Sequence, residues 1–135
     1  MATHMTILLA DDDRVQTLML TARLKAEGFK VAVAYDGNEA FTAAIRAKPD
    51  AIVLDLQMPA GNGQVVLERL KASSKTCQIP VIVVSGSEDP NVIPAVKGLG
   101  ADEYLPKPVN FEQLHAALLR VLRLAPKAPL PDGAR

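Results

Sequence analysis

Two hydrophobic patterns alternate along the chain. Short, almost continuous aliphatic runs are followed by longer stretches in which apolar residues recur every three or four positions. The runs span residues 7–10, 31–35, 51–54 and 80–84. Runs of this length with few polar positions are typical of strands that are buried on both faces, as in a parallel sheet. The sequence therefore predicts parallel strands connected by helices.

The stretches between the runs carry helix signals. The first helix is expected between an N-cap at Asp13 and a C-cap at Gly28. A second is expected from about Asn38 to Ala47, before Pro49. A third is indicated by the apolar positions of residues 65–70, and a last one by those of residues 111–122, with residue 110, an asparagine, as its cap.

The stretch after the fourth run is less regular, because Pro90, Pro94, Gly98 and Gly100 interrupt it. Proline has no N–H to donate inside a helix, so Pro94 either kinks a helix begun at Pro90 or itself starts a shorter one. A fifth strand at residues 103–105 is expected from its position. Strand and helix then alternate five times, which predicts a doubly wound α/β fold.

The domain organisation is expected to be simple. Residues 6–124 are assigned to one domain, and residues 1–5 to an N-terminal extension or tag remnant. Residues 125–135 carry three prolines and no periodicity, which indicates a disordered tail or a linker stub. No separate output domain is expected in this chain.

Composition narrows the function classes. Lys and Arg number 15 and Asp and Glu number 15, so the formal net charge is zero, which argues against the basic field of a nucleic-acid binder. The single cysteine, Cys77, excludes an intramolecular disulfide framework. No apolar run approaches the roughly 18 residues of a membrane span, and no signal peptide is visible. A cytoplasmic protein without membrane contact is expected.

Polar side chains follow the predicted strands where each strand ends. Asp11 and Asp12 follow the first run, Asp55 the third, Ser85 the fourth, and Lys107 the expected fifth strand. Sites in open α/β sheets lie beyond these carboxyl ends. Three converging carboxylates repel one another unless a cation is present, and Mg²⁺ is the hard divalent ion that suits oxygen ligands. A lysine opposite them completes a pocket suited to a transferring phosphoryl group.

Four motifs in this order are similar to those of a known family. They are Asp11-Asp12 after Ile-Leu-Leu-Ala, Asp55 within Leu-Asp-Leu-Gln-Met-Pro with Gly63 following, Ser85-Gly86 after Val-Ile-Val-Val, and residues 100–108, Gly-Ala-Asp-Glu-Tyr-Leu-Pro-Lys-Pro. Over residues 6–124 the chain resembles a receiver domain of bacterial two-component response regulators, of the chemotaxis-regulator type. The resemblance implies a flavodoxin-like (βα)5 sandwich whose five parallel strands lie in the order 2-1-3-4-5.

The resemblance also implies a role for each acidic residue. Asp55 would be the phosphoacceptor, taking a phosphoryl group from the phosphohistidine of a sensor histidine kinase or phosphotransfer protein. Asp12, Asp55 and the backbone carbonyl of Gln57 would ligate Mg²⁺, for which Mn²⁺ is a possible substitute, and Asp11 would act mainly through water. The chain would be no enzyme beyond catalysing its own phosphorylation and autodephosphorylation.

The remaining roles concern the response to phosphorylation. Lys107 would pair with Asp55 and then with the phosphoryl oxygens, and in the family the bond between Lys107 and Pro108 is usually cis. Ser85 would move its hydroxyl onto the phosphoryl group, and Tyr104 would follow as a rotamer switch. A downstream partner or a second copy would read the face made by the fourth helix, fifth strand and fifth helix.

The chain departs from the commonest family pattern in one loop, and two other positions are ones that vary in the family. The loop at residues 60–63 reads Ala-Gly-Asn-Gly, where a Met-Asp-Gly ending is more usual. Gln57 and Ser87 occupy two variable positions that tune autodephosphorylation in the family. The resemblance therefore implies the chemistry but not its rate.

Two other function classes stay open. Asp11, Asp13 and Val15 fit the Asp-x-Asp-x-Val signature of haloacid-dehalogenase-like phosphatases, with Asp11 as nucleophile and with Ser85 and Lys107 as the next two motifs. That assignment lacks a later acidic motif and leaves Asp55 without a role. A pseudo-receiver binding module that never takes phosphate is the other alternative, against which the complete set of acidic residues and lysine argues.

Overall fold

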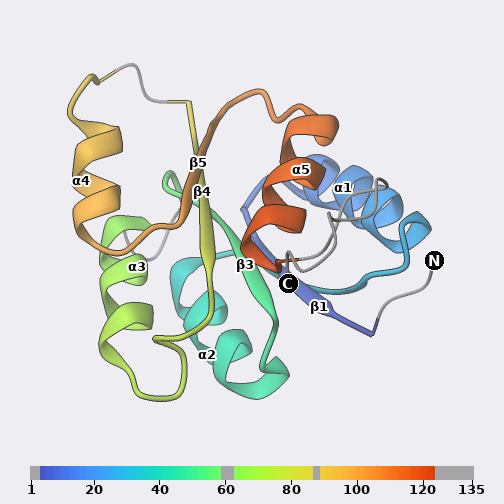
Figure 1. Ribbon diagram of the computed structural model, residues 1–135, viewed down its shortest axis with the longest axis horizontal. Helices are drawn as coiled ribbons and strands as arrows, with labels where there is room; N and C mark the ends of the chain where they lie inside the picture. The colour runs from blue at the N-terminus through green and yellow to red at the C-terminus, as the bar shows by residue number, and fades with distance from the viewer. Residues whose placement is uncertain (1–3, 59–62, 87–88, 124–135) are drawn as a thin grey trace, which may run out of the picture.

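The computed structural model describes residues 4–58, 63–86 and 89–123, over which five parallel strands alternate with five helices (Figure 1). The strands are β1 (Thr6–Ala10), β2 (Lys30–Ala34), β3 (Ala51–Asp55), β4 (Val81–Ser85) and β5 (Glu103–Pro106). The helices are α1 (Arg14–Ala26), α2 (Gly37–Ala47), α3 (Gly63–Ala72), α4 (Val92–Gly98) and α5 (Phe111–Val121). The strand order is β2-β1-β3-β4-β5, so the predicted fold class is confirmed.

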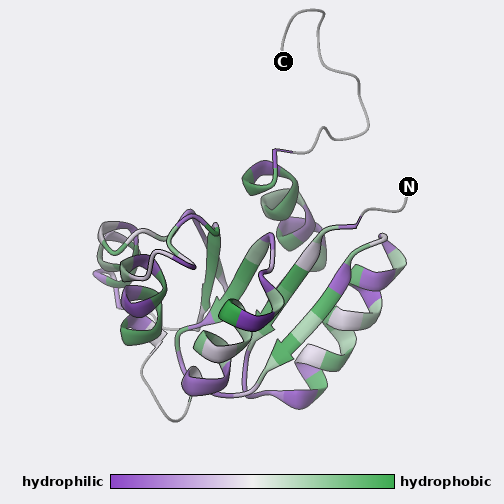
Figure 2. Ribbon diagram, turned by 90° about the horizontal axis from the view of Figure 1, so that it is seen from below, coloured by the Kyte–Doolittle hydropathy of each residue, from purple (hydrophilic) through white to green (hydrophobic). Residues whose placement is uncertain are grey.

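The sheet forms the middle of three layers. Helices α1 and α5 lie on one face, and α2, α3 and α4 lie on the other (Figure 1). Because side chains alternate along a strand, the buried residues divide into two cores. Ile7 and Leu9 of β1 pack with α1 and α5, whereas Leu8 and Ala10 pack with the opposite helices. In Figure 2 the strands are mostly hydrophobic, and the hydrophilic residues lie mainly on helices and loops.

One strand does not fit the expected burial. Strands β3 and β4 are buried at every residue, as predicted. In β2, however, Lys30 is exposed and only Ala34 is fully buried. The prediction of burial on both faces is wrong for β2, because it lies at the edge of the sheet and has a neighbour on one side only.

The predicted helix ends agree closely with the structure. Oδ1 of Asp13 accepts a hydrogen bond from the backbone N–H of Gln16 at 3.0 Å, so the predicted cap of α1 is confirmed. The asparagine before α5 acts in the same way. Gly28 is not itself the C-cap of α1: the cap is Glu27, and Gly28 follows with φ of 98°, a left-handed conformation that glycine adopts readily.

Helix α4 corrects both expectations for Pro94. The helix begins at Val92, two residues after Pro90, and Pro94 lies in its first turn. The N–H groups of a first turn have no acceptor within the helix, so a proline is tolerated there without a kink. The sequence expectations for residues 1–3, 59–62, 87 and 124–135 lie outside the described residues.

None of the helices described here has the length and apolar character needed to cross a membrane.

Candidate functional site

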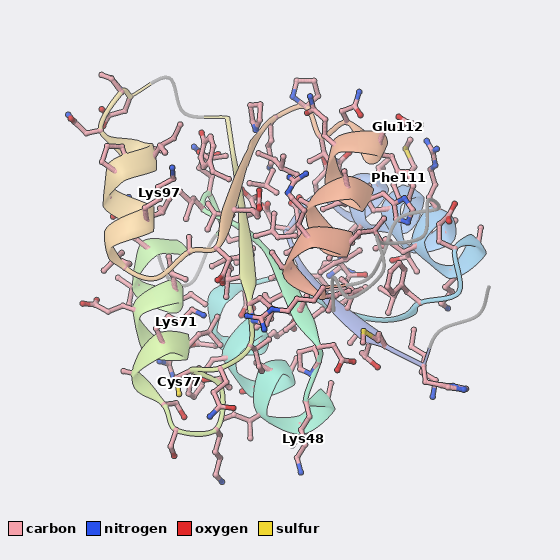
Figure 3. The ribbon with its side chains drawn as sticks, in the orientation of Figure 1. Lys48, Lys71, Cys77, Lys97, Phe111 and Glu112 are labelled. Atoms are coloured by element: carbon pink, nitrogen blue, oxygen red, sulfur yellow. The ribbon has the colours of Figure 1, made fainter. Side chains whose placement is uncertain are left out.

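Strand pairing brings the predicted polar residues to one edge of the sheet. Asp55 is the last residue of β3, Ser85 is the last residue of β4, and Asp11 and Lys107 directly follow β1 and β5. The backbone N–H of Lys107 donates to the carbonyl of Ser85 at 3.0 Å, and the peptide bond between Lys107 and Pro108 is cis. The start of α5, marked by Phe111 and Glu112 in Figure 3, lies at the end of the molecule away from Lys48.

Three carboxylates form the centre of this site. Asp11, Asp12 and Asp55 each offer an oxygen, and these atoms all lie within 4.8 Å of one another. Asp55 is only 1% exposed and Asp11 8%, whereas Asp12 is exposed to solvent. Such a group of hard oxygen donors fits a divalent cation such as Mg²⁺, with water able to complete the coordination on the exposed side.

Backbone hydrogen bonds hold the two buried carboxylates in place. Oδ1 of Asp11 accepts from the N–H of Asp13 at 2.9 Å, and Oδ1 of Asp55 accepts from the N–H of Gln57 at 3.0 Å. The side-chain Oε1 of Gln57 in turn accepts from the N–H of Gly86 at 3.1 Å, which ties the loop after β3 to the loop after β4. Each bond leaves the Oδ2 atom of its carboxylate to other partners.

Lys107 faces both buried carboxylates. Its Nζ lies 2.9 Å from Oδ2 of Asp55 and 3.7 Å from Oδ2 of Asp11. Burial lowers the pKa of Lys107, but the hydrogen bond and charge of Asp55, together with the charges of Asp11 and Asp12, outweigh it, so the pKa is raised above 10.5. The lysine is therefore a permanent cation at neutral pH.

One ammonium does not fully compensate the acidic group. Burial raises the pKa of Asp11 to about 6, and the nearby charge of Asp55 adds to this effect, while the N–H of Asp13 and the charge of Lys107 oppose it. A carboxylate with this pKa is close to taking up a proton. The site thus has an excess of negative charge that a bound cation would neutralise.

Ser85 and Tyr104 have different surroundings. Ser85 is 1% exposed and adjoins the acidic group, because it is the strand residue that follows the partner of Asp55 in the β3–β4 pairing. Tyr104 is half-buried and packs against the core beneath α2, α3 and α4. The structure therefore brings Asp11, Asp12, Asp55, Ser85 and Lys107 together, whereas the contacts of Tyr104 are with the hydrophobic core.

Two further residues support the site: Thr17 was not singled out from the sequence, whereas Gly63 belongs to the motif that contains Asp55. Thr17 of α1 is 2% exposed and lines a cavity of about 10 Å³ with Asp11 and Asp55, a space near the smallest that can hold a water molecule. Gly63, the first residue of α3, packs directly on Leu56 and on the carbonyl of Asp55. The only sequence feature that could have indicated a role for Thr17 is its polar side chain at a position of α1 that faces the core.

Comparison with known families agrees with this geometry. The family model for the response regulator receiver domain matches residues 7–119, which is most of the chain. The chain belongs to this family. The match decides against a haloacid-dehalogenase-like phosphatase, and receiver domains are not enzymes in the classical sense.

Curated relatives of the receiver domain are response regulators of bacteria. The chain is 44% identical over 119 residues to the transcriptional regulatory protein CpxR of Escherichia coli, covering 87% of the chain and 49% of CpxR. It is 39% identical over 121 residues to the response regulator MprA of Mycobacterium leprae, covering 88% of the chain and 51% of MprA. The chain thus spans about half the length of these relatives.

A solved receiver domain bears on the acidic group. The receiver domain of the sensor histidine kinase PA1611 of Pseudomonas aeruginosa superposes with a TM-score of 0.81 at 26% identity, covering 90% of this chain and 99% of that one. Its structure has a magnesium ion coordinated in the active-site cleft. The receiver domain described here presents oxygen donors suited to the same kind of ion.

Proposed function

We propose that this receiver domain is a phosphorylation-dependent switch in which Asp55 accepts a phosphoryl group from a phosphohistidine. The observation that carries the proposal is the pairing of the buried Asp55 carboxylate with the ammonium of Lys107 at 2.9 Å, beside two further carboxylates. A carboxylate oxygen of Asp55 would bond to phosphorus as the bond from phosphorus to the histidine nitrogen breaks. The released imidazole takes up a proton.

Asp11, Asp12 and Asp55, with the backbone carbonyl of Gln57, would hold Mg²⁺ or, as a substitute, Mn²⁺. The ion supplies charge neutralisation and orientation for the phosphoryl oxygens. The residues of the chain contribute the rest. Lys107 offers a second positive charge from the other side, and the buried position of Asp55 restricts access of water.

The signal would reach the surface through Ser85, Lys107 and Tyr104. Phosphorylation adds roughly −1.5 to −2 charge, which attracts the ammonium of Lys107 and the hydroxyl of Ser85. Tyr104 lies on β5, beside the core under α4, so a rotamer change there would alter the face made by α4, β5 and α5. We propose that a downstream partner or a second copy binds this face.

The partners upstream would be a sensor histidine kinase or a phosphotransfer protein, and the site of action the cytoplasm. We also propose that these residues do not bind nucleic acid directly and do not contact a membrane. The balanced charge of the chain supports the first of these points.

The test is the intact mass of the protein after incubation with acetyl phosphate and Mg²⁺. We expect wild type to gain one phosphoryl group and Asp55→Asn to gain none. Asp50→Asn is the matched control: this exposed aspartate precedes β3 at the opposite end of the same strand and should leave labelling unchanged.

Two results would overturn the proposal. If Asp55→Asn were still labelled and Asp11→Asn were not, the phosphoryl group would be on Asp11 and not on Asp55. Absence of labelling in folded wild type, with acetyl phosphate and with a phosphorylated histidine kinase, would instead indicate a pseudo-receiver.

A further inference from the structure

Strand β2 has one side on which no described strand pairs. The N–H of Lys30 donates to the carbonyl of Met5 at 2.9 Å, and the carbonyl of Ala34 accepts from the N–H of Asp11 at 3.0 Å. In a parallel ladder the residues of a strand alternate between its two sides, so the backbone groups of Val31 and Val33 point away from β1. This edge offers strand hydrogen bonds to a further chain.

A groove of about 690 Å³ runs beside this edge. Val33 and Tyr35 line it from the strand side. Helix α2 forms its other wall, with Asn38, Glu39, Thr42, Ala43, Arg46 and Ala47. The two alanines are small, so a neighbouring backbone can approach the edge without removing a large side chain.

The charges along this edge are arranged by sign. Helix α2 starts at the carboxyl end of β2 and runs back to the amino end, where Lys48 marks its end in Figure 3. Asp36 and Glu39 therefore lie beside the carboxyl end of β2, and Arg46 lies toward the amino end, where Lys30 is located. On helix α2 the acidic residues are therefore at one end and the basic residue at the other, while Arg14 of α1, 3.8 Å from the centroid of the Tyr35 ring, adds a positive charge at the carboxyl end of β2.

This polarity makes the α2 wall of the edge complementary to itself. A two-fold axis perpendicular to the sheet would place the β2 strands of two copies antiparallel, with the acidic end of each α2 against the basic end of the other. Glu39 of each copy would then face Arg46 of the other. Within the described residues neither Arg46 nor Lys30 has an ion-pair partner, so both charges are available for this contact.

We propose that the β2 edge is a self-association surface, through which two copies of this chain join their sheets by antiparallel β2 pairing. Val31 and Val33 supply the backbone hydrogen bonds, and the charges of α2 set the orientation. The surface contains none of the three carboxylates of the acidic group and no residue of α4, β5 or α5, so the proposal does not depend on phosphorylation. A contact formed by a five-residue strand and one helix face is small, and the association is correspondingly weak.

Sedimentation equilibrium of charge variants tests the proposal. For wild type, the mean mass should rise from monomer toward dimer between about 10 μM and about 1 mM, the range of weak interfaces. Arg46→Glu and Glu39→Arg should each stay monomeric, because each places like charges across the axis. An equimolar mixture of the two variants should associate again, since both cross-axis pairs then have opposite signs.

A control variant and a second measurement show whether the association uses this surface or another one. Lys25→Glu, a charge reversal at an exposed position of α1, should associate like wild type. Because Glu39 also accepts a bond from the N–H of Tyr35 at 2.7 Å, circular dichroism must show that Glu39→Arg remains folded. In wild type, amide exchange of Val31 and Val33 should slow as the concentration rises.

A wild type that stays monomeric over the whole concentration range would overturn the proposal. So would association of Arg46→Glu at wild-type strength, failure of the folded variants to associate when mixed, or dimer formation without slower exchange at Val31 and Val33. The last result would place the dimer contact on a different surface.

Discussion

The Nζ atom of Lys107 lies 2.9 Å from Oδ2 of Asp55, at a position where the same ammonium also faces Asp11. The lysine side chain is 27% exposed and that of Asp55 is 1% exposed, so the pair is largely shielded from water. Attraction between charges is stronger there than at the surface. The lysine is thus part of what makes two buried carboxylates compatible with folding.

Replacing Lys107 by methionine should destabilise the fold and increase its dependence on Mg²⁺. We expect a loss of about 1–3 kcal/mol in the free energy of unfolding, less than for a fully buried pair because the lysine is partly exposed. The measurement is urea unfolding at about pH 8, where Asp11 is ionised, with and without Mg²⁺.

Lys97→Met is the control, because Lys97 is an exposed lysine of α4, well away from the start of α5 in Figure 3. Mg²⁺ should stabilise Lys107→Met more than wild type or Lys97→Met, since the ion replaces a missing positive charge. An equal effect of Mg²⁺ on all three proteins would show that Lys107 and the ion do not act on the same carboxylates.

The raised pKa of Asp11 predicts a fall in stability as the pH rises. Its pKa is about 6 in the folded protein and 3.8 in the reference state, mainly because of burial. Between these values the unfolded chain has already lost the proton that the folded chain keeps, so stability decreases as the pH rises from about 4 to about 6. The full effect corresponds to about 3 kcal/mol.

Other carboxylates titrate in the same window, so the informative quantity is the difference between wild type and Asp11→Asn. Urea unfolding is followed by circular dichroism, because the chain has no tryptophan. The stability of wild type should fall relative to Asp11→Asn across this window, and Mg²⁺ should reduce that fall by favouring the ionised form. Parallel curves for the two proteins would contradict the assignment.

The sequence was sufficient to predict the strands and the residues at their carboxyl ends. Buried parallel strands are continuous apolar runs, so a polar residue at the end of one, such as Asp11 or Asp55, is conspicuous, whereas Lys107 follows a strand that was expected only from its position. Parallel pairing then places all such residues at one edge of the sheet, whatever the detailed packing. For this reason the gathering of Asp11, Asp12 and Asp55 could be anticipated from their spacing.

Features that depend on tertiary contacts could not be predicted in the same way. The apolar run of β2 resembles that of β3, so the hydrophobic pattern alone does not show that β2 is an edge, although the family resemblance implied it. The two prolines left the start of α4 open in the sequence, and only the structure shows that the helix begins at Val92. Likewise, nothing in the sequence shows how closely Gly63 approaches Leu56.

Gly63→Ala should damage both stability and the site. A Cβ atom at this position would overlap Cα of Leu56 and lie 2.8 Å from the carbonyl oxygen of Asp55, and both are backbone atoms that cannot move independently of β3. We expect a loss of about 1–3 kcal/mol, as for other overpacked sites, and slower phosphoryl transfer to Asp55. Thermal unfolding and the rate of labelling by acetyl phosphate measure the two effects.

Gly98→Ala is the matched control for that substitution. Gly98 lies in α4, and a Cβ atom there would meet nothing within 4 Å. Alanine should therefore stabilise the protein by up to about 1 kcal/mol through its helix propensity. If both substitutions changed the free energy of unfolding in the same direction and by the same amount, the close approach of Gly63 to β3 would not be the cause of the loss in stability.

Helix α4 should open more readily than α5, and its opening should respond to phosphorylation. Helix α4 has seven residues and no side-chain hydrogen bond from its N-cap, Asn91. Helix α5 has eleven residues, and Asn110 caps it by accepting from the N–H of Gln113 at 3.0 Å. Amide exchange should therefore be at least roughly tenfold faster across Val92–Gly98 than in the centre of α5, a difference of about 1.4 kcal/mol in opening free energy.

Phosphorylation provides the decisive comparison for α4. With acetyl phosphate and Mg²⁺, exchange across Val92–Gly98 should change in wild type, because this helix packs on the core that includes Tyr104. Asp55→Asn should show no such change under the same conditions. If exchange in α4 were the same before and after full phosphorylation of wild type, the signal would leave the domain by another face. Equal exchange of α4 and α5 in the unphosphorylated protein would show that the cap and the shorter length do not govern opening.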